Sequence, residues 1–362
     1  MVCYRVGKQR PGGPKGKTVQ PEKRKIFLRI YLTALFTLLM FGAVAFATET
    51  FRKIYFPFAW DDDEGAVWWE SAHVTHLRAL YHPIQQYPYF VVPYPPVFHA
   101  LTWLVQRITG DYLVAGRLIC VFSAIGISLL LGAIVWDASM PGTPGGVRAG
   151  GSALASLLCF RLDALNAYIP EMGVDLLALF FTFAGVFLFL RHNQKSRAPY
   201  PAFACFVVAI LAKQTMLAAP LACLLAATLV SRAKALRYFL FFICSSGAAV
   251  GLLAWATHGE ILRHVLLYNA VQPFSLGHWI RGFSANLLAT APVAAVSCLA
   301  LLPVLRHLRF EGQRSLAAWI HPHAKTSALR QALTVLGIEL AIALLISLTY
   351  GKSGSGLHYF LE

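Results

Sequence analysis

The chain carries a series of apolar stretches between residues 26 and 350, most of them close to the length that a helix needs to cross a bilayer. The first, residues 26–47, would form a helix about 33 Å long, against a hydrocarbon core of about 30 Å. Hydrophobic residues make up 57% of the sequence and charged residues 13%, whereas about a quarter of a soluble domain is charged. These features exclude a soluble globule and a disordered chain. They predict an all-α polytopic membrane protein.

The positions of lysine and arginine predict about nine crossings. Basic residues gather in the N-terminal tail and in clusters between alternate apolar stretches, which the positive-inside rule assigns to the cytoplasm. Most acidic residues fall in the other connections. The predicted spans are residues 26–47, 112–136, 149–168, 174–190, two short segments within 200–230, 238–256, 283–305 and 332–350.

Three regions follow from this topology: a basic cytoplasmic tail (1–25), a transmembrane domain (26–350) with a large first outer loop (48–111), and an outer C-terminal segment (351–362). The net charge of +15 comes from the short clusters and not from one basic face interleaved with aromatic residues, which argues against nucleic-acid binding. We expect the tail to orient the protein and to attract anionic membrane lipids.

The first outer loop opens with four consecutive acids, residues 61–64. They either form a solvated turn that caps the following helix, or repel one another enough that one has a raised pKa or binds a cation. His73 and His76 could join Asp61 or Asp63 around a divalent metal, although a histidine pair at this spacing is more often interfacial.

A second acidic pair, Glu171 and Asp175, lies in a short outer turn. Asp175 precedes an apolar run, so a helix cap is its simplest explanation. Alternatively it faces Asp63 and Glu64 across an outer cavity, where one carboxylate acts as a general base.

Two apolar segments are too short for simple crossings. Residues 97–108 follow a pair of prolines and predict a helix that lies at the outer interface. Residues 200–230 predict two short spans or a re-entrant hairpin, with Lys213 and Gln214 at the turn. Lys213, with Arg117 as a second candidate, could supply positive charge to an anionic substrate.

The order of these features resembles the polyprenyl-phosphate-dependent GT-C membrane glycosyltransferases, which include protein O-mannosyltransferases, aminoarabinose transferases and lipopolysaccharide-core galacturonosyltransferases. The motifs that carry the resemblance are Asp63-Glu64-Gly65, Tyr94-Pro95-Pro96, Gly116-Arg117-Leu118, the segment from Glu171 to Asp175, Lys213-Gln214-Thr215 and the segment from Gly354 to Glu362.

The resemblance implies transfer of a sugar from a polyprenyl phosphate to a glycan, lipid or protein acceptor on the outer face of the cytoplasmic (inner) membrane, with inversion at the anomeric carbon. It implies a catalytic role for Asp63 or Glu64 and for Asp175. It also implies phosphate binding by Lys213 and Arg117. Further donor-site or acceptor-site candidates are Glu171, Tyr94, Gln214 and Tyr359.

The chain departs from the family in two places. Some relatives have a lysine where this chain has Tyr94, and relatives continue into further spans beyond residue 362, so that this is either a short variant or a truncated, non-catalytic relative. The alternative from another class is a transporter or flippase. The acids lie in outer turns and no inverted repeat is evident, which favours the transferase.

Overall fold

The computed structural model describes residues 21–139, 142–160, 169–195, 197–271, 273–288, 290–291 and 327–348. Within these ranges the chain forms helices and loops and no β-strand, so the expectation of an all-helical protein is confirmed there. The helices are α1 (Pro21–Ile54), α2 (Asp62–His73), α3 (Leu77–Leu80), α4 (Val97–Thr109), α5 (Tyr112–Ala138), α6 (Gly145–Cys159), α8 (Asp175–Gln194), α9 (Tyr200–Ala212), α10 (Ala218–Val230), α11 (Arg232–Ala256), α12 (Glu260–Leu262), the π-helical turn η1 (Arg263–Tyr268) and α15 (Ser327–Ile346).

Four helices of the described residues are long and apolar enough to cross a membrane: α5, α8, α11 and α15. The nine predicted crossings therefore stay a prediction. Helix α1 contains the predicted span 26–47, while the predicted spans 149–168, 283–305 and 332–350 extend outside the described residues. The tail up to residue 20 and the segment 351–362 also lie outside them.

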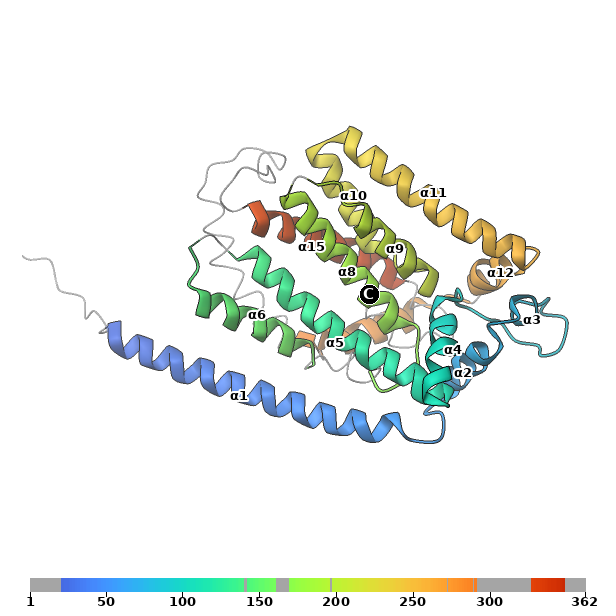
Figure 1. Ribbon diagram of the computed structural model, residues 1–362, viewed down its shortest axis with the longest axis horizontal. Coiled ribbons are helices and arrows are strands. Elements are labelled where there is room, and N and C mark those ends of the chain that lie inside the picture. Colours follow the sequence, from blue (N-terminus) through green and yellow to red (C-terminus); the bar gives the residue numbers. More distant parts are fainter. Residues whose placement is uncertain are drawn as a thin grey trace, which may run out of the picture.

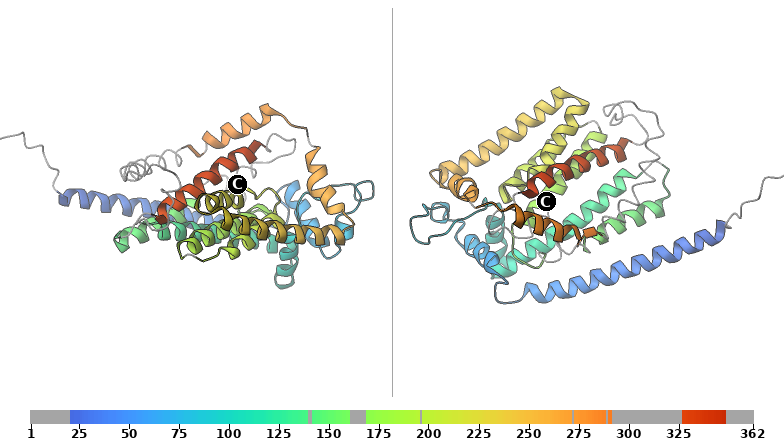
Figure 2. Two further views of the ribbon diagram at one scale, coloured as in Figure 1. Left: turned by 90° about the horizontal axis from the view of Figure 1, so that it is seen from above. Right: turned by 180° about the vertical axis from the view of Figure 1, so that it is seen from behind.

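The long helices alternate in direction, and residues 55–111 gather at one end of the bundle, which we call the loop end (Figure 1). Helices α2, α3, α4 and α12 lie there, and the view from behind in Figure 2 shows the same grouping. Two hydrogen bonds join the loop end to neighbouring helix ends. Arg78 Nε donates to the backbone oxygen of Ala256 at the end of α11, and Gln214 Nε2, from the turn after α9, donates to the backbone oxygen of Pro93. The alternation agrees with the predicted topology, and the assignment of the loop end to the outer face stays a prediction.

Helices α9 and α10 have 13 residues each and are joined by a turn at residues 213–217. This matches the two short segments expected within 200–230. Helix α4 begins directly after the paired prolines, as expected, and ends at Gly110, whose φ of 78° is the left-handed conformation that glycine adopts without strain. Asp111 then caps α5 by accepting from Val114 N at 3.0 Å, so that α4 and α5 turn sharply at the loop end.

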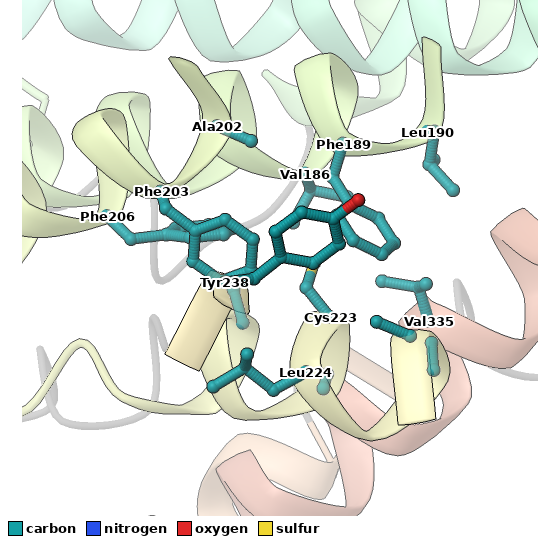
Figure 3. Close-up of a cluster of buried hydrophobic side chains, with 14 of the residues drawn as sticks. Val186, Phe189, Leu190, Ala202, Phe203, Phe206, Cys223, Leu224, Tyr238 and Val335 are labelled. Carbon is teal, nitrogen blue, oxygen red and sulfur yellow. The ribbon is translucent and has the colours of Figure 1, made fainter. Parts of the chain in front are cut away.

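A core of aromatic and small side chains joins α8, α9, α10, α11 and α15 (Figure 3). The Phe203 ring stacks on Tyr238 of α11 with ring centroids 5.7 Å apart, while Gly185 gives the Phe206 ring room against α8. The labelled members are Val186, Phe189 and Leu190 of α8, Ala202, Phe203 and Phe206 of α9, Cys223 and Leu224 of α10, Tyr238 of α11, and Val335 of α15. All are buried, so this packing holds the α9–α10 pair firmly against the longer helices.

Candidate functional site

A cavity of about 210 Å³ lies at the loop end. Three segments of the chain form it: one face of α2 with its N-cap, the loop at residues 91–94, and the connection from residue 171 into the start of α8. The ionisable residues that line it are Asp61, Asp63, Glu64, Glu70, Tyr94, Glu171 and Asp175. The structure therefore brings the two predicted acidic segments together at one cavity.

Helix α2 supplies its acids by helical spacing. Asp63, Ala66, Val67 and Glu70 all line the cavity, at the i, i+3, i+4 and i+7 positions that share one helix face. Asp61 caps the helix, because its Oδ1 accepts from Glu64 N at 2.8 Å. The capping interpretation of the acidic run is thus correct for Asp61. Asp63 lies on the helix face that lines the cavity.

Glu64 is held by Arg117 of α5 in a buried, two-pronged ion pair. The Nε and Nη2 atoms of Arg117 lie 2.8 and 2.7 Å from the two carboxylate oxygens, and both side chains are at most 1% exposed. The carboxylate also accepts from the backbone N–H groups of Trp60 and Met172, each at 2.8 Å. The rest of the guanidinium donates, at 2.5 to 3.3 Å, to the backbone oxygens of Lys53, Ile54, Phe56 and Phe58.

This arrangement uses every N–H group of the guanidinium. We therefore replace the phosphate-binding role that the sequence suggested for Arg117 by a structural one: it closes the end of α1 onto α5 and α2. Glu64 receives four donated hydrogen bonds, so both of its oxygens are already occupied by protein donors and are not available to a substrate hydroxyl. Of the two acids implied as base, Asp63 is the better placed.

Asp175 and Lys213 also form a buried pair. Lys213 Nζ lies 2.7 Å from Asp175 Oδ1, and the side chains are 1% and 12% exposed respectively. The pairing joins the start of α8 to the turn between α9 and α10. Asp175 is in the first turn of α8 and does not cap it, since Val174 occupies the N-cap position without a side-chain hydrogen bond. Lys213 thus reaches the cavity wall through Asp175.

Glu171 lies on the same wall, outside the long helices. Burial raises its pKa from 4.5 to about 7, and the carboxylates of Asp61 and Glu64 add to the rise, while Lys53 and Arg117 oppose it. The carboxyl group is therefore about half protonated near neutral pH, so it can both donate and accept a hydrogen bond there.

The remaining candidates divide into those near the cavity and those elsewhere. Tyr94 lines the cavity, and Gln214 contacts its rim through the hydrogen bond from Nε2 to Pro93 O at 3.0 Å. Tyr359 lies outside the described residues.

The two histidines of the first loop do not join the acids. His73 Nδ1 lies 2.8 Å from Trp69 O and its ring stacks on the Trp69 ring, while His76 is exposed and contacts Thr75. Among the described residues no group of three or more His, Cys, Asp or Glu side chains is arranged to hold a metal ion. Binding of a divalent metal stays an untested prediction.

The sequence did not reveal a third buried acid at this site, Glu70, or its partner. Glu70 lines the cavity, and its Oε2 lies 3.2 Å from Nε2 of His99 in α4, with both side chains buried. The signal available in the sequence was the seven-residue spacing between Asp63 and Glu70, which places both on one face of α2. A single histidine in an apolar helix gave no signal for its partner.

No protein-family model, curated protein or solved structure matches the chain.

Proposed function

We propose that the protein is an integral membrane glycosyltransferase, which moves a sugar from a polyprenyl-phosphate donor to a glycan, lipid or protein acceptor on the outer face of the cytoplasmic membrane. The observation that carries the proposal is the cavity at the loop end, which Asp63 and Asp175 both line from segments more than 100 residues apart. A single displacement of a phosphate leaving group needs a base and a cation: Asp63 lines the cavity as the base, and Lys213 lies behind its wall, paired with Asp175.

In this reaction the Asp63 carboxylate removes the proton of an acceptor hydroxyl. The hydroxyl oxygen forms a bond to the anomeric carbon, the bond from that carbon to the phosphate oxygen breaks, and its electron pair leaves with the polyprenyl phosphate. A single displacement inverts the anomeric centre. Lys213, which Asp175 holds at 2.7 Å, stabilises the departing phosphate.

Glu171 contributes through its protonation state. A fully ionised carboxylate here would repel the incoming phosphate, whereas a carboxyl with a pKa of about 7 carries a proton part of the time. The cavity therefore holds less negative charge at neutral pH than its number of acids suggests.

A transporter or flippase is the second candidate, because one observation favours it. The break between α9 and α10 places a buried ion pair at a helix interruption, which is a common feature of transporter binding sites.

Transfer from a panel of radiolabelled polyprenyl-phosphate sugars to an extract of outer-leaflet lipids and glycans tests the proposal. The protein is purified in detergent, and Asp63→Asn and Lys213→Ala are compared with wild type. Asp62→Asn is the matched control, since Asp62 is exposed and does not line the cavity. We expect Asp63→Asn to lower the rate by about 10²- to 10⁴-fold, Lys213→Ala to lower it strongly, and Asp62→Asn to leave it unchanged.

Full activity of Asp63→Asn would remove Asp63 from the mechanism. Absence of transfer with every donor, from protein whose thermal unfolding is cooperative, would favour the transporter. Movement of the same labelled lipids between the leaflets of reconstituted vesicles would then be measured.

A further inference from the structure

Glu70 and His99 form a buried pair beside the cavity that the proposed mechanism does not use. His99 Nε2 lies 3.2 Å from Glu70 Oε2, and the two side chains are 0% and 1% exposed. On the other side of the ring, His99 Nδ1 lies 3.1 Å from the hydroxyl of Ser71, which in turn donates to Val67 O at 2.7 Å. The imidazole therefore lies between a hydroxyl and a carboxyl group.

The serine determines which ring nitrogen carries a proton. Because the Ser71 hydrogen is used in the bond to Val67 O, the hydroxyl oxygen faces His99 as an acceptor, and Nδ1 must donate. In a neutral imidazole Nε2 is then an acceptor. A hydrogen bond between Nε2 and the carboxyl oxygen 3.2 Å away would then need a proton on that oxygen, which an ionised Glu70 does not have.

The alternative is a buried imidazolium beside a buried carboxylate, and the surroundings give it little support. Glu64, a buried acid paired with a cation, receives two hydrogen bonds from Arg117 and two from backbone N–H groups. Glu70 Oε2 and His99 Nε2 lie 3.2 Å apart, and neither atom makes a hydrogen bond to any residue that the structure describes. Two buried charges with so little compensation cost more than a neutral pair that shares a proton.

The groups that face Glu70 act in the same direction. Burial and then the Asp63 carboxylate raise the pKa of Glu70, and burial lowers that of His99 to about 3. Tyr81, from the segment after α3, donates its hydroxyl to Tyr94 O at 2.7 Å, and its pKa is raised by burial and by Glu70. The other ionisable residues on the cavity wall are Asp61, Glu64, Tyr94, Glu171 and Asp175, and none of them carries a positive charge that would favour a carboxylate at Glu70.

We propose that at neutral pH Glu70 is protonated and His99 is a neutral imidazole, so that Glu70 is a positioning residue that leaves Asp63 as the ionised carboxylate on the cavity face of α2. This rests on the proposed function, in which Asp63 is the base. A second carboxylate two turns along the same face would raise the pKa of Asp63 and make it a poorer proton acceptor at low pH. A neutral Glu70 avoids that effect.

Infrared spectroscopy of the purified full chain tests the charge state without any substrate. The carbonyl band of a protonated carboxyl group at neutral pH should lose intensity in Glu70→Gln and keep it in Asp62→Asn. A spectrum of Glu70→Gln that matches wild type in this band, with a loss in the carboxylate band instead, would overturn the inference.

The pH profile of transfer tests the effect on Asp63. The acidic limb of kcat/KM reports ionisation of the base in the free enzyme. With a neutral Glu70 this limb should stay at the same pH in Glu70→Gln, whose amide also donates to His99 Nε2. A shift of the limb to lower pH would mean that an ionised Glu70 had been raising the pKa of Asp63, and would contradict the inference.

The two readouts separate the two proposals. Loss of the band in Glu70→Gln without transfer by any form of the protein would support the neutral pair and contradict the transferase function. Sugar transfer by the protein, with the same carbonyl band in Glu70→Gln as in wild type, would support the transferase function and contradict the neutral pair.

Discussion

Replacement of Arg117 by lysine tests whether this arginine is a structural clamp. Lysine keeps the positive charge but offers three donors from one nitrogen, so it cannot bridge both oxygens of Glu64 and also reach the end of α1. At least two of the six acceptor contacts of Arg117, those to Glu64 and to four backbone oxygens, would be left unsatisfied in a buried region.

The expected cost follows from these contacts. A buried acceptor left without a partner costs about 1–3 kcal/mol. With two such acceptors, we expect Arg117→Lys to lower the free energy of unfolding by about 2–6 kcal/mol. Arg52→Lys is the matched control, because Arg52 is 73% exposed and lies 3.8 Å from Glu49; a pair of this kind contributes at most about 1 kcal/mol.

The assay is unfolding of the detergent-solubilised protein by a denaturing detergent, followed by tryptophan fluorescence. If Arg117→Lys unfolds at the same denaturant concentration as Arg52→Lys, then the contacts of Arg117 do not hold the loop end together and the guanidinium is available for another role.

Three further substitutions, one of them with a matched control, test separate parts of the structure. Glu171→Gln should stabilise the protein above pH 7. The pKa of Glu171 in the folded state, about 7, lies above the ordinary value of 4.5, so the stability of the wild type falls as the pH rises between these values. Unfolding measured from pH 4 to 8 should show this fall in the wild type and not in the variant. Gly185→Ala should destabilise by about 1–3 kcal/mol, because its Cβ would meet the Phe206 ring. Gly247→Ala, with nothing within 4 Å, should be neutral or stabilising in the same unfolding assay, and equal effects of the two would contradict the packing. Asp61→Ala should cost about 1 kcal/mol through loss of the α2 cap, and an unchanged unfolding midpoint would argue against that cap.

Features that depend on chain length and local pattern could be predicted from the sequence. The 31 residues at 200–230 are too few for two full spans, and the structure has two 13-residue helices with Lys213 at the turn. The paired prolines predicted the start of α4 at Val97. Placement of Asp63 and Asp175 at one cavity followed from assigning both turns to the same side, since alternate helices return the chain to the same end.

Features that depend on tertiary packing could not be predicted. An arginine at the start of a span looks the same in sequence whether it binds a phosphate or clamps a loop. Its role depends on the backbone path of residues 53–58, which no local pattern specifies. The contact between Glu70 and His99 likewise depends on how α2 packs against α4. The seven-residue spacing between Asp63 and Glu70 indicates that both lie on one face of α2, but it does not indicate that His99 is the partner of Glu70.

The shortness of α9 and α10 bears on how far a lipid-anchored molecule would have to travel. A 13-residue helix rises about 20 Å, roughly 10 Å less than the hydrocarbon thickness of a bilayer. In a membrane, the end of such a short helix pair lies deeper than the ends of full-length spans, or the bilayer becomes thinner around the pair. Under the proposed function, the head group of the polyprenyl phosphate would then approach the turn between α9 and α10 close to its resting depth, with little of its chain drawn out into water.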